Sequence, residues 1–308
     1  MFLSRRWWKA TGRLIMPVYE NEYKIWTGEK RSIFSRILAF PKFNFLRIKG
    51  KKFLYPPLII GGFTFLAFLF IIYARVNVKI LENMGINPKF LLSVDKKFFF
   101  LYIVLQYPFL LFLTIMVGPG LISRDIRHKA LPMILSKPVC RWEYLFGKFL
   151  VLFLLLSVLT WIPGFLLFFI QTLAVPKASE WRMNFWNQNV WLLLRIFGFS
   201  FLAISTLNLM VMMFSSLTSN HRYAGAGVII SIIGSVIAGG VADIIFRSHL
   251  WKLLSITHCV TTFGSWLFGL ESTASAPPGL AVLVILVIWA VCIVILFKRT
   301  RAFQFYRE

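Results

Sequence analysis

Acidic residues and cysteines are scarce in this sequence. Its 308 residues include 11 Asp and Glu against 34 Lys and Arg, which gives a net charge of +23. The three cysteines, Cys140, Cys259 and Cys292, fall in separate parts of the chain, so we expect no intrachain disulfide. The few carboxylates and histidines show no spacing that would bring catalytic or metal-binding groups together. We therefore predict neither a catalytic site nor a metal site.

A phosphate-binding loop is also absent. Such a loop needs Gly-x-x-x-x-Gly-Lys followed by Ser or Thr, ahead of a helix. In this sequence the Gly-Lys pair at 50–51 is followed by Lys52, and the pair at 147–148 is followed by Phe149. We therefore expect this chain to hold no nucleotide of its own.

Apolar residues are abundant. They make up 58% of the chain, and they gather in blocks of about 20 residues, the length of a membrane-spanning helix. This predicts an all-α polytopic membrane protein with a transmembrane domain over 57–297, in which Pro108 and Pro163 kink two helices. The six predicted spans are 57–74, 98–118, 149–173, 190–214, 223–246 and 279–297.

The distribution of positive charge predicts how the spans are oriented. Lys and Arg are more frequent in segments 1–56, 119–148 and 298–308 than in the loops on the opposite side. By the positive-inside rule, we place both termini in the cytoplasm and the protein in the cytoplasmic membrane. Because the basic residues flank spans and form no soluble domain, anionic lipid headgroups explain the charge better than nucleic acid does.

Two further segments lie outside the spans. In the tail 1–56, Ser32 can cap a helix that continues to about Leu38 and lies at the membrane surface, with apolar and basic residues on different sides. An irregular linker is the alternative, because Pro41 interrupts the pattern. The outer segment 247–278 is too polar to span but keeps apolar residues at helical spacing. We predict one or two short helices there, dipping into the outer leaflet.

The cytoplasmic loop 119–148 has a pattern of its own. Apolar residues recur every four positions from Ile122 to Ile134, so they share one face of a helix, and charged residues occupy much of the rest. Pro132 is expected to end or bend this helix, and a second helix is expected to begin at Arg141. Two such helices either offer a surface to a soluble partner or cover the ends of the spans.

The same loop resembles the signature of a known family. The residues that carry the resemblance are Ile122-Ser123-Arg124-Asp125 through Leu131-Pro132, Leu135-Ser136-Lys137-Pro138-Val139, Arg141-Trp142-Glu143-Tyr144-Leu145 and Gly147-Lys148. They closely resemble type-2 ABC exporter permeases, which have the type V exporter fold. Similar residues in the tail and outer segment are Pro17-Val18-Tyr19-Glu20-Asn21-Glu22-Tyr23, Leu254-Ser255 and Leu267-Phe268-Gly269. Cys140 stands where the family usually has Ser or Thr, and Thr257 where proline is more usual.

The resemblance implies a non-catalytic permease subunit of an exporter. In that family the loop contains a coupling helix that sits in a groove of a cytoplasmic ABC ATPase, which binds ATP and Mg²⁺. The tail supplies a connecting helix, and a second permease, identical or homologous, completes a dimer. The residues that we expect to dock the ATPase are Ser123, Arg124, Asp125, Ile126, Arg127, His128, Lys129, Leu131 and Leu135.

A stripe of small residues lies in the fifth predicted span. Gly227, Ser231, Ser235 and Gly239 recur every four residues. Small side chains on one face allow another helix to approach closely. That helix could belong to the same subunit or to a dimer partner, and the sequence does not separate the two.

Arg195 and Asp243 are the clear intramembrane charges. A charge at the bilayer centre costs about 2.5–3.5 kcal/mol on insertion scales. Because both residues lie near the outer ends of their predicted spans, we predict that they form an ion pair. Contact with a substrate is the alternative.

Two other functions stay open from the residues alone. A polytopic enzyme acting on lipids would need catalytic groups that converge at the membrane interface, and the acidic and histidine residues are few. A complex of the same fold could also sense or extract membrane-bound clients without transporting a substrate. The sequence does not identify a substrate.

Overall fold

The computed structural model describes residues 41, 52–77, 93–129, 141–174, 179–270 and 277–305. Contacts divide the chain into two units, 1–32 and 33–308, and every described residue belongs to the second. The helix predicted in the tail lies outside the described residues. All regular elements of the described part are helices, which confirms the predicted all-α class.

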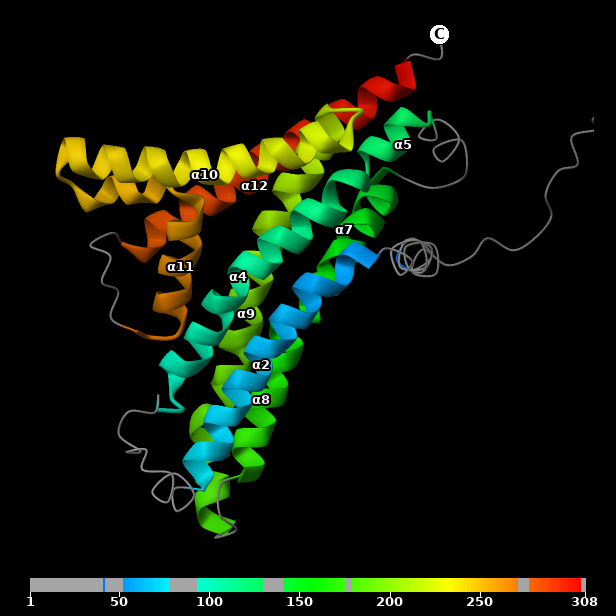
Figure 1. Cartoon of the computed structure of the whole chain (residues 1–308). Coiled ribbons are helices and arrows are strands. Elements are labelled where there is room, and N and C mark those ends of the chain that lie inside the picture. The colour runs from blue at the N-terminus through cyan, green and yellow to red at the C-terminus, as the bar shows by residue number, and fades with distance from the viewer. Residues whose placement is uncertain are drawn as a thin grey trace, which may run out of the picture. The chain divides into compact units, whose positions relative to one another are not determined.

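Six candidate membrane-spanning helices are present in the described part, as predicted. They are formed by α2 (Tyr55–Val76), α4 (Lys96–Val117), α7 (Arg141–Ser157) continued by α8 (Trp161–Ala174), α9 (Ser179–Leu217), α10 (His221–Phe246) and α12 (Pro278–Phe305). The shorter elements are η1 (Lys52–Leu54), η3 (Gly118–Gly120), α5 (Ser123–Arg127), η4 (His249–Leu254) and α11 (Ile256–Leu267). In Figure 1, α2, α4, α8 and α9 run along one another, whereas α10 leaves this bundle at a steep angle.

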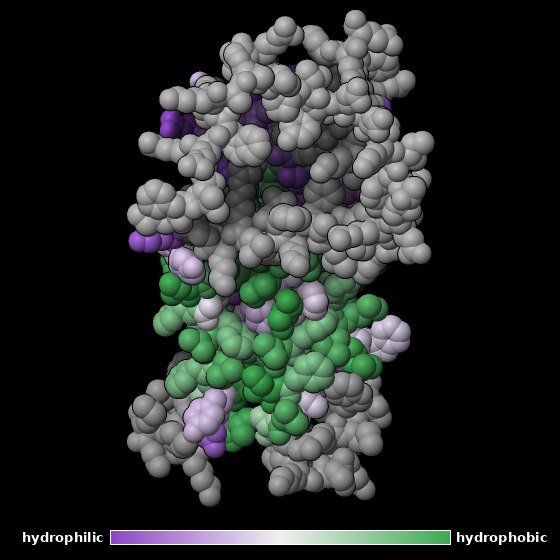
Figure 2. All heavy atoms as spheres, turned by 90° about the vertical axis from the view of Figure 1, so that its right-hand side faces the viewer, coloured by the Kyte–Doolittle hydropathy of each residue, from purple (hydrophilic) through white to green (hydrophobic). Residues whose placement is uncertain are grey.

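The outer surface of this bundle is apolar. In Figure 2 the described residues across the middle of the face shown are mostly hydrophobic. Large apolar side chains such as Ile59, Phe63 and Phe70 of α2 are more than half exposed. Such a surface is unfavourable in water and favourable against lipid tails, so the chain is a multi-pass membrane protein.

The third span is broken between α7 and α8. Pro163 has no amide hydrogen, and its ring displaces the carbonyl of Leu159 from helical hydrogen bonding. A turn at 158–160 accommodates this, and the Tyr102 hydroxyl donates a hydrogen bond to the Leu159 carbonyl at 3.0 Å. The kink predicted at this proline is therefore a turn stabilised by α4. At Pro108, by contrast, α4 continues without a break.

The central helix of the core is α9, which packs against α4, α7, α8, α10, α11 and α12. Its side chains Ile196, Ala203, Leu207 and Val211 are buried. The helix begins at Ser179, before the predicted span start at residue 190. The apolar part of the span is preceded by several polar residues, such as Glu180, Arg182 and Gln188, and these residues continue the same helix.

Two short helices, η4 and α11, join α10 to α12, in the segment where short helices were predicted. The chain reverses after α10 at Arg247, which has a φ of 49°. The Ser255 hydroxyl then accepts a hydrogen bond from the His258 amide at 3.4 Å and caps α11. As a result η4 packs back against α10. The depth of these helices in a membrane stays a prediction.

Candidate functional site

The predicted docking loop begins with a tight contact between η3 and α9. A Cβ at Gly118 would lie 2.6 Å from Cγ1 of Val211, so a side chain at this position would need the α9 valine to move. The backbone of the loop can therefore approach α9 more closely than any other residue would allow. This fixes the start of the loop on the central helix.

Ser215 of α9 holds the first turn of α5. Its hydroxyl accepts hydrogen bonds from the amides of Ser123 at 2.9 Å and Ile122 at 3.2 Å. The same hydroxyl donates to the Pro119 carbonyl at 2.7 Å, which also accepts from the Ser123 hydroxyl. These groups are buried, and the first amides of a helix have no partners within the helix. Ser215 therefore supplies the hydrogen bonds that the start of α5 needs.

Asp125 joins α5 to α7. Its Oδ2 lies 2.8 Å from Nζ of Lys148 and accepts a hydrogen bond from the Tyr144 hydroxyl at 2.8 Å. The side chains of Asp125 and Lys148 are only 13% and 7% exposed. Ile122 is buried and Ile126 packs against the same apolar core. One side of α5 is thus attached to both α7 and α9.

The last residue of α5 and the two residues after it are basic and exposed. Arg127, His128 and Lys129 are exposed, and Arg124 is half-buried beside Gly120. Seven of the nine predicted docking residues, from Ser123 to Lys129, are described by the structure, and they do not all lie on the same side. Ser123 and Asp125 face the helices, whereas the basic residues from 127 to 129 face outward.

The helix also ends earlier than predicted. We expected it to continue to Pro132, but α5 ends at Arg127 and is followed by His128 as its C-cap. Lys129 has a φ of 50°, and its amide bonds to the Ile126 carbonyl at 3.1 Å. This left-handed residue cannot continue a right-handed helix. Residues 130–140, which include the predicted contacts Leu131 and Leu135, lie outside the described residues.

The stripe of small residues on α10 has contacts within this chain. A Cβ at Gly227 would lie 2.7 Å from Cδ1 of Phe214 on α9, and one at Gly239 would lie 3.2 Å from the Ser255 amide nitrogen. Ser235 accepts a hydrogen bond from the Ile256 amide at 3.3 Å. Ser231 bonds to the Val228 carbonyl of its own helix. A dimer interface at this stripe stays a prediction.

Arg195 and Asp243 do not form the predicted ion pair. Nη1 of Arg195 donates to the Phe268 carbonyl at 3.4 Å, whereas Oδ2 of Asp243 lies 3.4 Å from Nζ of Lys252. The prediction assumed that α9 and α10 stay close along their lengths. They are joined by a short turn and meet near it, at Phe214 and Gly227, but α10 then diverges.

The far end of α10 lies instead in a small polar group with η4 and α11. Here Asp243 and Lys252 form their ion pair, and His258 of α11 is close to both. Burial lowers the pKa of His258, the positive charge of Lys252 lowers it further, and Asp243 opposes these effects. The arrangement ties Asp243 to the connecting helices.

Sequence reasoning missed Ser215 and Tyr144 as parts of this site. Tyr144 was only one residue of the resembling run, and Ser215 stands in an apolar span with no motif around it. The one available signal was polarity, because Ser215 and Ser216 are adjacent hydroxyls near the end of a predicted span. A polar side chain there needs a partner.

Comparison with known proteins adds one finding to this geometry. A family model described as "ABC-2 family transporter protein" matches residues 34–303. The match includes all six candidate spans and the loop with α5. No curated protein matches the chain.

Proposed function

This chain belongs to the ABC-2 family of transporter proteins. From this premise, we propose that it is a permease subunit of an ATP-driven exporter and that a separate ATPase docks on it through α5. Membership makes the chain a membrane permease of an ABC transporter, and it implies a partner ABC ATPase. The export direction, the docking position and the dimer are our proposals. The docking position rests on the geometry of α5 and on the charge distribution of the sequence, and the export direction and the dimer rest on the resemblance of the loop to exporter permeases.

The observation that carries the proposal is the attachment of α5 to two spans at once. Ser215 connects its first turn to α9, and Asp125 connects it to Tyr144 and Lys148 of α7. A force applied to the outer side of α5 would therefore be transmitted to both helices through buried polar contacts. This is the property that a coupling element needs, because loosely attached loops move without moving the spans.

The exposed basic residues at the end of α5 support docking of the ATPase at this position. The helix ends at the exposed Arg127 and is followed by the exposed His128 and Lys129, so an ATPase groove with acidic residues would be complementary. By the positive-inside rule this loop is cytoplasmic, where ATP is available. ATP and Mg²⁺ would be bound by the ATPase, and its closure would press on α5.

In the proposed complex, two permeases line one pathway and each docks one ATPase. Both termini of each permease lie in the cytoplasm, and the complex sits in the cytoplasmic membrane. Closure of the two ATPases would tilt α7 and α9 together, because α5 is attached to both. In this scheme the second permease is either a second copy of this chain or a homologous chain.

The test is co-purification of the ATPase in mild detergent, followed by an ATPase assay. Arg127→Glu with Lys129→Glu should lower ATPase recovery by at least about tenfold, since like charges brought together cost several kcal/mol. Lys96→Glu with Lys97→Glu, an equal charge change at two exposed residues at the start of α4, is the matched control and should retain the partner. Undiminished recovery with the double reversal, from a chain that remains folded, would refute docking at α5.

A further inference from the structure

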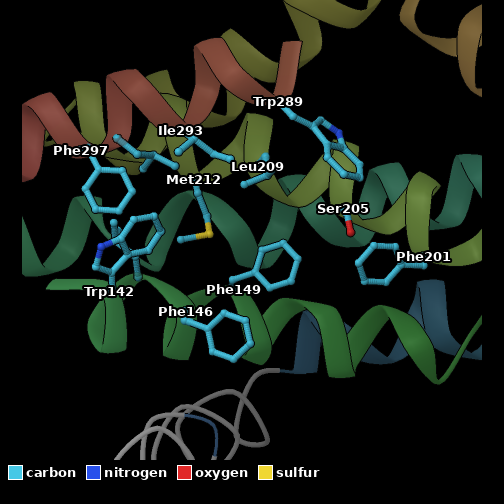
Figure 3. Close-up of a pocket in the computed structure, with 12 residues that line it drawn as sticks. Trp142, Phe146, Phe149, Phe201, Ser205, Leu209, Met212, Trp289, Ile293 and Phe297 are labelled. Carbon is cyan, nitrogen blue, oxygen red and sulfur yellow. The ribbon is translucent and has the colours of Figure 1, made fainter. Parts of the chain in front are cut away.

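An apolar cavity lies between α7, α9 and α12, and none of the residues that line it belongs to α5. It has a volume of about 280 Å³. Figure 3 shows aromatic side chains from all three helices turned toward it. The side chains used in the argument below are Trp142, Phe149, Ser205, Leu209, Trp289 and Phe297. All three helices belong to candidate membrane spans, so lipid is the solvent around this cavity.

The size and lining of the cavity favour an apolar occupant. Smaller apolar cavities, of about 150 Å³, stay free of water and bind apolar ligands. The cavity also has a direction, since Figure 3 places Trp142 and Phe297 at one end and Phe201 and Trp289 at the other. On α9 its lining extends from Phe201 to Met212, about 16 Å at 1.5 Å per residue. This is roughly half of a hydrocarbon core about 30 Å thick, and therefore the depth of one leaflet.

The end of the cavity at Trp142 and Phe297 has basic residues next to it in the sequence. Trp142 is 66% exposed, and its ring centroid lies 4.0 Å from that of Phe297. Arg141 directly precedes Trp142, and the exposed Lys298 directly follows Phe297. Arg141 and Lys298 are therefore sequence neighbours of the aromatic pair at this end of the cavity. Basic residues beside an apolar cleft between spans are a feature of sites for anionic headgroups.

We propose that this cavity binds one acyl chain of an anionic phospholipid, whose headgroup lies at Arg141 and Lys298. The chain would run from Trp142 along Phe149 and Leu209 toward Trp289. The lipid belongs to the leaflet on the α5 side, and its acyl chain fills a space bordered by both helices that α5 is attached to. The proposal goes beyond the exporter function and does not depend on where the ATPase docks.

Ser205 distinguishes this occupant from a more polar ligand. Its hydroxyl is buried at the inner end of the cavity and has no hydrogen-bond partner among the described residues. At the same end, the Trp289 indole donates to the Thr206 hydroxyl at 3.0 Å and is satisfied. An acyl chain makes no use of the Ser205 hydroxyl, whereas a ligand with an acceptor group at this depth would depend on it.

The test measures binding of phosphatidylglycerol brominated on its acyl chains, with brominated phosphatidylcholine for comparison. Bromine quenches tryptophan fluorescence, and subtracting the signal of Trp142→Phe isolates the tryptophan at the cavity mouth. In detergent, the full chain should bind phosphatidylglycerol more tightly than phosphatidylcholine. Arg141→Gln and Lys298→Gln should each reduce that preference about fivefold, whereas Arg222→Gln, an exposed charge elsewhere, should not.

Filling the cavity provides the second arm. Leu209→Phe and Ile293→Phe narrow it from two different helices and should each weaken binding of both lipids at least about tenfold. Ile230→Phe, at a site on α10 that is 70% exposed, is the matched control. Ser205→Ala should leave binding unchanged. Equal binding of the two lipids, unchanged binding in both filled variants, or loss of binding in Ser205→Ala would each overturn the proposal.

Discussion

Nζ of Lys148 lies 2.8 Å from Oδ2 of Asp125, in a pair where both side chains are almost completely buried. Lys148 belongs to α7 and Asp125 to α5, so one ion pair joins the exposed loop to the third span. The Tyr144 hydroxyl binds the same carboxylate oxygen at 2.8 Å. The charge of Asp125 therefore serves attachment, although its position among basic residues suggested a surface role.

Replacing one member of this ion pair should destabilise the protein more than replacing both members. Asp125→Asn leaves a buried, unpaired ammonium, and Lys148→Met leaves a buried carboxylate, so we expect each to lower the free energy of unfolding by about 3 kcal/mol. The double variant should lose less than the sum, because no unpaired charge remains. Thermal unfolding in detergent measures this cycle, and additive losses would show that the two charges are independent.

The contact of Ser215 with α5 can be tested by substitution, with the neighbouring serine as a control. Ser215→Ala removes the acceptor for the Ser123 and Ile122 amides and a donor to Pro119, so buried groups lose their partner at a cost of about 1–3 kcal/mol. We expect lower stability and weaker stimulation of the partner's ATP hydrolysis.

The matched control is Ser216→Ala. Ser216 is also buried, but among the described residues its hydroxyl bonds only to the Met213 carbonyl of its own helix. That carbonyl keeps its helical partners when the hydroxyl is removed. Equal effects of the two alanine substitutions on coupling would contradict the role assigned to Ser215.

Local patterns predicted the elements of this fold better than their contacts. The six spans followed from apolar runs of the right length, because a helix in lipid must satisfy its own backbone. The break near Pro163 followed from its missing amide. The end of α5 at Arg127 did not follow from the sequence, because the residue types of His128 and Lys129 do not predict a left-handed conformation.

The candidate site was harder to predict because its contacts join distant parts of the chain. Spacing in the loop identified α5 as a charged, amphipathic element. This spacing could not show that Asp125 faces inward, since its orientation depends on contacts with Tyr144 and Lys148 of the next helix. The predicted pairing of Arg195 with Asp243 was wrong for a related reason. The positions of two residues along their spans do not show whether the two helices stay close together at that depth.

Gly118 should tolerate no side chain unless α9 makes room. The Cβ of Gly118→Ala would lie 2.6 Å from Cγ1 of Val211, and overpacking of this kind costs about 1–3 kcal/mol. Val211→Ala in the same chain should recover part of that loss by removing the clashing methyl groups. Gly62→Ala is the control, since among the described residues nothing beyond its chain neighbours and its own helix backbone lies within 4 Å of its Cβ position. Unfolding midpoints compare the three variants, and an unaffected Gly118→Ala protein would disprove the close approach.

Arg195 and Asp243 should act independently of each other. Arg195→Gln weakens the contact with the Phe268 carbonyl, and Asp243→Asn removes the charge paired with Lys252. Because the two sites share no partner, their losses in unfolding free energy should add within about 0.5 kcal/mol. Asp243→Asn combined with Lys252→Gln should instead show coupling of about 0.2–1 kcal/mol, the range for a partly exposed pair. Coupling between Arg195 and Asp243 larger than that between Asp243 and Lys252 would mean that α9 and α10 approach each other along their outer halves, and the divergence of α10 would be wrong.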